Sequence, residues 1–379
     1  MTRHVVHIST VHSALDGRIF YREAMTLHEL GYRVTVCGVH DKDDNIEGIA
    51  IRGLKKFPSR IKRLTTSWYR ALKVVQSING DLYQFHDVEL LPSAILAKTL
   101  LGKRVVFDAH EDTSLFMLKD WLASWLRRPV CAFITKLDSC CARRVDGIVV
   151  PTRLLHEKYK RLARRVVTFV NYPAPAFLRE RERTWKPFSE RQNEIIHLGT
   201  LRISRLRFLL SIAKRFLQAR PNWSWTFLGM PDAALNWLKR NVPDEIRQRL
   251  HAVGKIPHME VAERLNQAKI GINYHTLDSR QIQVAIPVKV FEYLSCGLAV
   301  ITTKVPLLVE LVKDCPAVAL TEEDEETYLS DLLNLADRKD LSNLSLNARK
   351  FSDERFNCRT EAKRLSDFYE SIFRDYEKI

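Results

Sequence analysis

The sequence lacks most features of membrane-spanning, secreted or disordered proteins. It has no apolar run of about eighteen residues, which is the length that a transmembrane helix needs. Its N-terminus, MTRHVVHISTVH, turns polar too early for a secretory signal peptide. Its seven cysteines show no CxxC spacing, so we expect reduced and mostly buried thiols. Without internal repeats or low-complexity tracts, the chain is predicted to be a cytoplasmic globular protein.

Positive charge is what the chain has in excess. It carries 60 lysines and arginines against 45 aspartates and glutamates, a net charge of +15. Residues 1–172 hold 28 of the basic and 17 of the acidic residues, a balance of +11, which leaves +4 for the rest. A basic N-terminal half predicts an anionic partner, which can be nucleic acid, an acidic membrane face or a phosphate-bearing substrate.

Strand-like apolar runs alternate with helical patterns along all 379 residues, which predicts two α/β domains with parallel sheets. The runs lie at 4–10, 33–39, 82–86, 104–109, 147–151, 166–170, 194–199, 224–229, 270–274 and 299–303. A charged, proline-rich stretch at 173–192 predicts a linker between Rossmann-like domains at 1–172 and 193–355. Residues 356–379 form an amphipathic helical pattern that we expect to cross back to the first domain. Ligands of such sheets bind where the strands end.

The most informative motif is PVKVFEY at 287–293, followed by LSCGLAVITT. Lys289 and Glu292 are three residues apart, so they share one face of the predicted helix. A cation and a carboxylate placed in this way can hold a phosphate and a ribose hydroxyl of one ligand, with the helix N-terminus adding amide donors. The alternative is a surface ion pair in front of a buried strand.

A second motif, HLGTLRISRLR at 197–207, gives a strand, a glycine, a loop and a helix. Gly199 permits a close approach of the backbone to a ligand. Arg202 and Arg205 follow at a position that suits a diphosphate, because guanidinium groups donate in a fixed fork. Solvated arginines at a helix start are the alternative.

Polar residues also follow two strands of the first half. His110 and Glu111 form a candidate acid/base pair, and His86 and Asp87 occupy a similar place after another strand. Loop histidines at strand ends are the alternative. A zinc site from all four is conceivable, but the pairs lack the helical spacing of HExxH motifs.

Together these motifs resemble glycosyltransferase family 4, whose members have the GT-B fold. The resemblance rests on PVKVFEYLSCGLAVITT, HLGTLRISR, VVFDAHED at 105–112 and the opening HISTVHSALDGRIFYREAMTLHELGYRVTV, and it covers nearly the whole chain. It implies two Rossmann-like, doubly wound domains facing a central cleft, with the C-terminal helix crossing back. It further implies a retaining transfer from a nucleoside-diphosphate sugar, linked to UDP or GDP.

The resemblance also implies roles for individual residues. Glu292 should bind the donor ribose. The nucleobase should lie at a turn formed by Gly254, Lys255 and Ile256. The diphosphate should be held by Gly17, Gly199, Arg202, Arg205 and Lys289. The catalytic set should be Asp16, His110 and Glu111, with His86 and Asp87 on the acceptor side.

One position departs from the family pattern. Many members carry a first glutamate, eight residues before the second, that holds the sugar, and Val284 stands there in this chain. The sugar loop is therefore expected to use backbone amides of Val284, Ala285 and Ile286. We expect Lys289 to belong to a subgroup pattern that compensates for the missing carboxylate.

The implied mechanism needs no metal or other cofactor. Departure of the nucleoside diphosphate builds negative charge, and fixed cations lower that barrier by about 3 kcal/mol each. Asp41 and Asp43 form a literal DxD, which binds metal in a different glycosyltransferase fold. Here they lie in a turn-like DKDDN stretch, where we do not expect a metal site.

Two segments bear on the acceptor and on location. Residues 57–76 carry an apolar stripe flanked by basic residues, formed by Ile61, Leu64, Trp68, Leu72 and Val75. Packing on the chain's own sheet explains the stripe, and contact with an anionic membrane surface is the alternative. Residues 116–130 add aromatic and basic side chains. If both segments face outward, we expect a peripheral protein of the inner plasma membrane that acts on a lipid-linked saccharide in bacterial surface polysaccharide synthesis.

Two other functions stay open. A sugar-nucleotide epimerase would keep the fold and turn over the donor without an acceptor. A basic nucleic-acid-binding module would need aromatic and basic residues interleaved on strands, and the aromatics here lie mostly in helical stripes, so no nucleic acid is expected.

Overall fold

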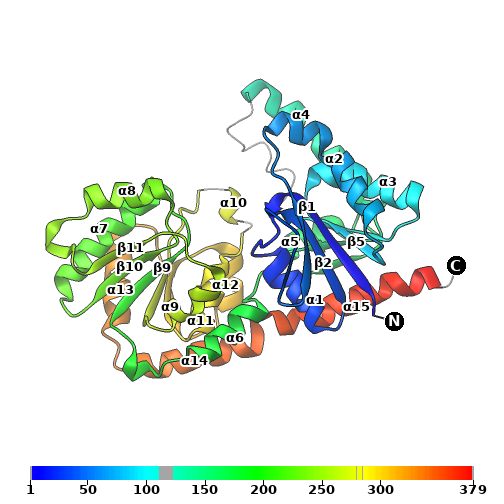
Figure 1. Ribbon diagram of the computed structural model, residues 1–379. Helices are drawn as coiled ribbons and strands as arrows, with labels where there is room; N and C mark the ends of the chain where they lie inside the picture. The colour runs from blue at the N-terminus through cyan, green and yellow to red at the C-terminus, as the bar shows by residue number, and fades with distance from the viewer. Residues whose placement is uncertain (1, 111–122, 279, 284, 378–379) are drawn as a thin grey trace. The chain divides into compact units, whose positions relative to one another are not determined.

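The computed structural model describes residues 2–110, 123–278, 280–283 and 285–377 (Figure 1). The chain divides into two compact units. We call Met1–Pro175 with Cys358–Ile379 the N-terminal unit, and Ala176–Asn357 the C-terminal unit. Glu111 and Val284, both predicted site residues, lie outside the described residues, and so do residues 116–122 of the 116–130 segment.

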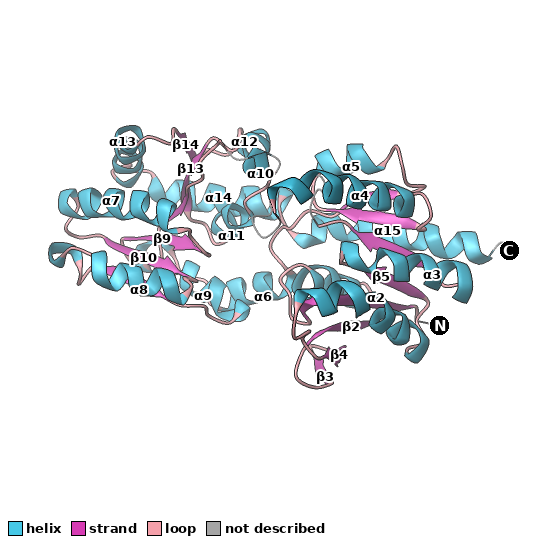
Figure 2. Ribbon diagram, turned by 90° about the horizontal axis from the view of Figure 1, so that it is seen from above, coloured by secondary structure: helices cyan, strands magenta, loops and turns pink. Residues whose placement is uncertain are grey.

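The N-terminal unit is built on an eight-stranded sheet of order β3-β4-β2-β1-β5-β6-β7-β8, in which only the β3–β4 pair is antiparallel among the described pairs. Its strands are β1 (His4–Ser13), β2 (Arg33–Val39), β3 (Asp44–Ile46), β4 (Ile49–Leu54), β5 (Leu82–Phe85), β6 (Val105–Asp108), β7 (Gly147–Val150) and β8 (Val166–Thr168). Its helices are η1 (Ile19–Ala24), α1 (Met25–Glu29), α2 (Arg60–Ser77), η2 (Val88–Leu90), α3 (Leu91–Leu101), α4 (Ser124–Ala142), α5 (Arg153–Tyr159) and α15 (Cys358–Glu377). Helices cover both faces of the sheet (Figure 2).

The helix that follows β1 begins with a π-helical turn, η1, before α1 continues it. The backbone N–H groups of Phe20 and Tyr21 both donate to the carbonyl of Asp16, at 3.1 and 3.3 Å. This widened turn places Arg18 where its guanidinium reaches Asp108 at the end of β6.

Helix α15 completes the N-terminal unit, in agreement with the prediction that the C-terminal helix crosses back to the first domain. Gly147 of β7 leaves space for the ring of Phe368, which would lie 2.4 Å from a Cβ atom at that position. Tyr369 is fully buried and donates its hydroxyl hydrogen to the side-chain carbonyl of Gln84 on β5. The last helix is therefore joined by packing and by a buried hydrogen bond to the centre of the first sheet.

The C-terminal unit contains a wholly parallel six-stranded sheet of order β11-β10-β9-β12-β13-β14. Its strands are β9 (Glu194–Leu198), β10 (Ser224–Leu228), β11 (Leu250–Val253), β12 (Ile270–Asn273), β13 (Ala299–Thr303) and β14 (Val318–Thr321). Its helices are α6 (Pro175–Arg183), η4 (Phe188–Glu190), α7 (Ile203–Ala219), α8 (Asp232–Asn241), η5 (Asp244–Ile246), η6 (His258–Glu260), α9 (Val261–Leu265), α10 (Arg280–Gln283), α11 (Val288–Ser295), α12 (Pro306–Val312), α13 (Glu325–Ala336) and α14 (Leu341–Arg355). The stretch 173–192, predicted as a linker, holds α6 and η4, and Phe177 is fully buried there.

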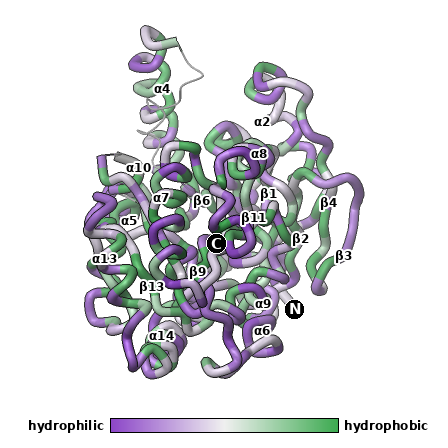
Figure 3. The backbone as a smooth tube through the Cα atoms, turned by 90° about the vertical axis from the view of Figure 1, so that its left-hand side faces the viewer, coloured by the Kyte–Doolittle hydropathy of each residue, from purple (hydrophilic) through white to green (hydrophobic). Residues whose placement is uncertain are grey.

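Hydropathy follows this layering, because most strand residues are buried and apolar, whereas the helices mix polar with apolar residues. Helix α4 is an example in Figure 3, where green and purple segments alternate along the tube. The buried polar side chains of the N-terminal sheet gather where β1, β5 and β6 end, which is where a parallel sheet binds ligands.

Helix α11 is fixed to the C-terminal sheet by Tyr293. Its hydroxyl accepts from the N–H of Leu198 at 2.7 Å and donates to the carbonyl of Ile272 at 3.2 Å. The ring lies over Gly271, where a Cβ atom would meet ring carbons at 2.4 to 2.9 Å. We conclude that the glycine is required for the close contact between α11 and β12.

We expect Gly271→Ala to lower the free energy of unfolding of the C-terminal unit by about 1–3 kcal/mol, because the added methyl group overpacks a rigid ring. Urea denaturation followed by circular dichroism measures this effect. Gly254→Ala is the matched control, since its Cβ atom would make an ordinary 3.5 Å contact with Leu235. Equal stability of the two variants would contradict the expectation.

Candidate active site

Two glycines leave bare backbone at the ends of neighbouring strands in the C-terminal unit. Gly199 follows β9 with φ +94°, and Gly229 follows β10 with φ +85°, a region that other residues rarely adopt. A Cβ atom at Gly229 would lie 3.3 Å from the Cα atom of Gly199. At Gly199, a Cβ atom would lie 3.8 Å from the Nζ atom of Lys289. The backbone at the end of β9 is thus open beside a lysine ammonium group.

Lys289, in the first turn of α11, is half-buried beside a histidine. Its Nζ atom is 3.1 Å from Nε2 of His197, which is fully buried on β9. Burial and the nearby charge of Arg205 lower the pKa of Lys289 to about 7, against the opposing effect of Glu292. Burial and Lys289 hold the pKa of His197 well below its usual range, so His197 is neutral and accepts the hydrogen bond.

A second cation and histidine stand next to this pair. The Nη1 atom of Arg205, in the first turn of α7, lies 2.9 Å from Nδ1 of His275. Burial, Lys289 and Arg205 lower the pKa of His275 to about 3. Arg202, the exposed N-cap residue of α7, adds charge that lowers the pKa of Arg205 after the effect of burial. The cluster therefore concentrates positive charge at the strand ends, and this is the electrostatic condition for binding an anion.

The other predicted donor-site residues lie in the same unit. Glu292 sits one turn after Lys289 on α11 and is 8% exposed. The turn at Gly254–Ile256 follows β11, whose last residue Val253 accepts from the N–H groups of Gly229 and Met230 at 3.1 and 3.0 Å. Ala285 and Ile286 are half-buried just before α11. The ends of β9, β10 and β11 thus bring the predicted phosphate and nucleobase elements to one edge of the sheet.

In the N-terminal unit, Asp108 is the centre of a buried polar cluster. Its Oδ2 atom lies 3.0 Å from Nδ1 of His86, 2.5 Å from Nε2 of His110 and 2.9 Å from Nε of Arg18. Although burial raises it, the pKa of Asp108 is held well below its usual range by the charges of Arg18 and His110. His110 is thereby oriented by a fully buried carboxylate.

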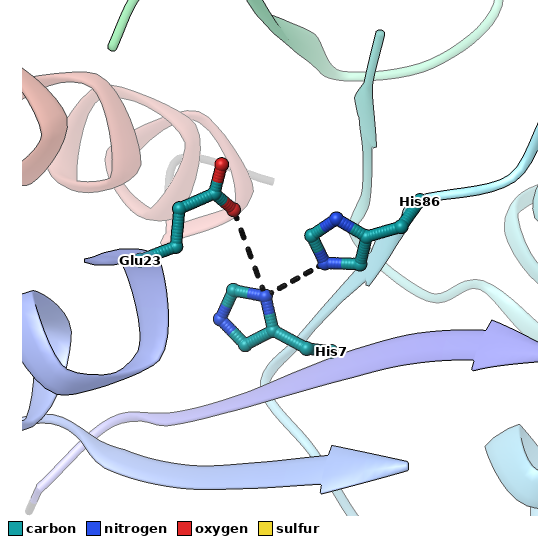
Figure 4. Close-up of side chains that lie close together, drawn as sticks. All are labelled: His7, Glu23 and His86. Atoms are coloured by element: carbon teal, nitrogen blue, oxygen red, sulfur yellow. Dashed lines mark hydrogen bonds and ion pairs between the residues drawn. The ribbon is translucent and has the colours of Figure 1, made fainter. Parts of the chain in front are cut away.

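A second layer lies beneath this cluster. Figure 4 shows His7 between His86 and Glu23, with Nδ1 of His7 2.9 Å from Nε2 of His86 and 3.9 Å from Oε2 of Glu23. Glu23 also pairs with Arg18 at 2.9 Å and accepts from the side-chain amide of Gln84 at 2.5 Å. Burial and the charge of Asp108 raise the pKa of Glu23 well above its usual range.

Asp16, Gly17 and Asp87 have local structural contacts. Asp16 accepts from the backbone N–H groups of Arg18 and Ile19 at 2.7 and 3.2 Å, so it caps the π-helical turn. The carbonyl of Gly17 accepts from Arg22 at 2.6 Å. Asp87 accepts from the hydroxyl of Ser9 at 3.0 Å and from the N–H of Thr10 at 2.7 Å, which ties η2 to the end of β1.

His12 is a site residue that the sequence reasoning missed. It lies between Asp16 at 3.6 Å and Asp87 at 3.7 Å, and hydrogen bonding to Asp16 raises its pKa. With His86, Asp87 and His110 it forms the polar part of a pocket of about 530 Å³. The remaining lining residues are Val11, Arg60, Arg63, Leu64, Val88, Glu89, Phe107, Val130 and Ile134. The pocket therefore joins a polar floor to apolar side chains, among them Leu64 of α2 and Val130 and Ile134 of α4, with Arg60, Arg63 and Glu89 adding charge to its lining.

The structure thus places the predicted residues in two groups, one in each unit. His197, His275 and Gly229 join the first group, and His12, Arg18 and Asp108 join the second. The sequence contained a signal for two of these residues. His197 begins the motif HLGTLRISRLR, and Asp108 lies within VVFDAHED.

Comparison with known proteins agrees with this geometry. Residues 192–338 match the family described as "Glycosyl transferases group 1". No curated protein matches the chain. Among solved structures, sucrose-phosphate synthase from Thermosynechococcus elongatus is 14% identical with a TM-score of 0.70, covering 98% of this chain and 100% of its own. The catalytic domain of starch synthase IV from Arabidopsis thaliana, bound to ADP and acarbose, is 11% identical with a TM-score of 0.65, at 98% and 99% coverage. An alpha-glucosyltransferase in complex with UDP is 15% identical with a TM-score of 0.63, at 97% and 99% coverage.

Proposed function

We propose that this chain, which has the GT-B fold and matches a glycosyltransferase family over residues 192–338, transfers a sugar, with retention, from a UDP- or GDP-linked donor to a saccharide or lipid-linked acceptor. The observation that carries the donor half is the cationic cluster of Lys289, Arg205 and Arg202 beside the bare backbone of Gly199. A nucleoside diphosphate is the anion that such a cluster suits, because guanidinium and ammonium groups stabilise the charge that develops on the leaving oxygens.

In this proposal the cations and the carboxylate hold different parts of the donor. Lys289 and Arg205 neutralise the diphosphate, and their neutral histidine partners orient them without cancelling their charge. Glu292, one turn further along α11, accepts from the ribose hydroxyls. The leaving group is balanced by side chains and not by a metal ion at the diphosphate.

The acceptor half rests on the pocket of the N-terminal unit. Its polar floor of histidines and Asp87 suits sugar hydroxyls, and its apolar walls suit a lipid tail. Apolar side chains are exposed on the same helices, with Ile61 of α2 77% exposed and Trp125 and Phe133 of α4 75% and 68% exposed. Basic residues flank them, a combination that binds anionic membrane surfaces.

The stripe on α2 divides into two parts. Val75 is buried and Leu72 packs against the core, whereas Ile61, Leu64 and Trp68 are exposed. Packing on the chain's own sheet therefore accounts for Leu72 and Val75, and the exposed residues are the ones to which a membrane contact can be assigned. No helix among the described residues is long and apolar enough to cross a membrane. We propose that the exposed part of α2 attaches the protein peripherally to the membrane, and that the protein acts in bacterial surface polysaccharide synthesis.

The experiment that tests the donor half is thermal stabilisation of the purified protein by UDP, GDP, ADP and their common sugars. A ligand that binds only the folded state raises the melting temperature. We expect one base to give a clear shift, and Glu292→Ala to weaken binding of that nucleotide by more than about tenfold through loss of hydrogen bonds to a charged group. If no nucleotide raises the melting temperature, or if a folded Glu292→Ala variant binds the nucleotide with unchanged affinity, the assignment of the donor site is contradicted.

Donor binding should depend on pH through Lys289. The pKa of its ammonium group is about 7 in the free protein, and a bound diphosphate raises this pKa. Below pH 7 the group is charged in both states, whereas above pH 7 binding must take up a proton. We therefore expect the dissociation constant of the nucleotide sugar to rise by up to about tenfold per pH unit above 7.

Isothermal titration calorimetry with the intact nucleotide sugar measures this slope, because a sugar-esterified diphosphate has no terminal phosphate that titrates near neutrality. In Lys289→Arg the guanidinium remains charged, so the slope should disappear. A pH-independent dissociation constant in the unmodified protein would show that Lys289 does not change its protonation on binding.

A further inference from the structure

We propose that His86, Asp108 and His110 form a binding site for one Zn²⁺ ion at the floor of the pocket in the N-terminal unit. The three residues follow or end the adjacent strands β5 and β6, and their ligand atoms converge on one point. Nδ1 of His86 and Nε2 of His110 are 3.1 Å apart, and Oδ2 of Asp108 lies 3.0 Å from the first and 2.5 Å from the second.

Hydrogen bonding alone explains this arrangement poorly. Without an ion, Oδ2 of Asp108 is approached by a ring nitrogen of each histidine and also accepts from Nε of Arg18 at 2.9 Å, while the two ring nitrogens lie 3.1 Å from each other. A carboxylate oxygen has two lone pairs, so it cannot serve all three neighbours as donors at once. Oδ1 of the same carboxylate meanwhile accepts from Nη2 of Arg18 at 2.7 Å. A cation shared by the two imidazoles and Oδ2 removes this crowding, because the histidine nitrogens then point lone pairs at the ion.

The donor set and its dimensions match zinc. Two imidazoles and one carboxylate are the three protein ligands of an open zinc site, at about 2.0–2.2 Å from the ion. Nitrogens 3.1 Å apart then subtend an angle of about 100° at the ion, close to tetrahedral. The contact between Asp108 and His110 has to lengthen by about 0.5 Å when the ion enters.

The proposed ligands are oriented by hydrogen bonds from neighbouring residues, as the ligands of metal sites usually are. The second nitrogen of His86, Nε2, bonds to Nδ1 of His7 at 2.9 Å, which fixes the orientation of the ring. Arg18 fixes the Asp108 carboxylate with two donors. The carboxyl groups of Asp108 and Glu23 both contact Arg18, and Asp87 lies on the far side of His12, so acidic residues surround the proposed ion.

The pocket supplies the fourth position. His86 and His110 both line it, and His110 is 17% exposed, so one side of the ion faces the pocket. Water or a hydroxyl group can occupy that position. If the proposed function holds, the hydroxyl belongs to the saccharide acceptor, which assigns the ion to acceptor binding.

The site is tested on the full-length protein without an affinity tag. We expect about one zinc per chain by elemental analysis after expression in zinc-supplemented medium. After removal of the metal by a chelator, Co²⁺ should bind at one equivalent and give visible d–d absorption typical of four-coordination. His110→Ala should weaken Co²⁺ binding by more than about hundredfold, since it removes a ligand, whereas loss of an outer partner costs about 10–100-fold.

His40→Ala is the matched control, because His40 is a histidine of the same unit whose ring bonds only locally, to the Lys42 carbonyl at 2.9 Å. It should bind Co²⁺ like the unmodified protein. Absence of zinc together with no stoichiometric Co²⁺ uptake, or equal uptake by the unmodified protein and a folded His110→Ala variant, would overturn the proposal. None of these measurements involves a nucleotide or an acceptor, so their failure is distinct from failure of the proposed function.

Discussion

Replacement of Lys289 by methionine is expected to lower the turnover of the nucleotide-sugar donor by about 10²–10³-fold, the effect of removing one preorganised charge at a developing anion. The methionine keeps the length and apolar stem of the lysine but removes the ammonium group 3.1 Å from His197. The free protein should not lose stability, because burial already disfavours that charge and lowers the pKa of Lys289 to about 7. Release of the nucleoside diphosphate, by transfer or by slow hydrolysis, measures the effect.

Lys269→Met is the matched control for this experiment. Lys269 lies just before β12, at the other end of the same sheet, and its Nζ atom bonds to Asn193 at 2.7 Å. It should leave turnover within about twofold of normal, as expected for surface substitutions. If Lys289→Met turns over the donor as fast as the control does, Lys289 does not stabilise the leaving nucleoside diphosphate.

Replacement of Arg18 by methionine is expected to lower the free energy of unfolding of the N-terminal unit by about 3–5 kcal/mol, because it leaves buried charge without its partner. Arg18 is 6% exposed and pairs with Asp108 at 2.7 Å and with Glu23 at 2.9 Å, both of which are fully buried. It also donates to the carbonyl of Phe169 at 3.0 Å. Its loss should therefore disturb both the polar cluster and the connection after β8.

The control is Arg52→Met, which removes an arginine from the same unit whose partner, Asp43, is more than half exposed. An exposed pair contributes less than about 1 kcal/mol. Urea denaturation of both variants compares their free energies of unfolding, and hydrogen exchange identifies the unit that unfolds in the first transition. If the two lose the same stability, the cluster around Asp108 does not depend on the buried cation.

Most inner strands and the edge strand β8 could be predicted from the sequence, whereas β3, β4, β11 and β14 could not. Runs such as RVVFDA and AVITT are mostly apolar because β6 and β13 are buried on both faces. Edge strand β11, LHAV, exposes His251 and Ala252, and the first three residues of β14, VALT, are only half-buried. Neither has the apolar length or the alternation that distinguishes a strand from a loop.

The same division applies to the site. Lys289, Glu292 and Arg205 could be predicted because each belongs to a motif in which the neighbours in sequence are also neighbours in space. The role of Arg18 could not, because its partner Asp108 is ninety residues away and the bond forms only when η1 is placed against the end of β6. His275 likewise meets Arg205 across seventy residues. Pairings of this kind come from the sheet order, which local patterns do not encode.

The place of α15 in the N-terminal unit has a consequence for the order in which the protein forms during translation. Domains usually fold in the order in which they leave the ribosome. Here the C-terminal unit is one continuous stretch, Ala176–Asn357, whereas the N-terminal unit waits for residues from Cys358 onward. Until those residues emerge, the space over Gly147 is uncovered and Gln84 lacks its bond from Tyr369. The N-terminal unit is therefore expected to finish folding after the C-terminal unit, although its first residues are synthesised earlier. It should also depend on chaperones for a longer time.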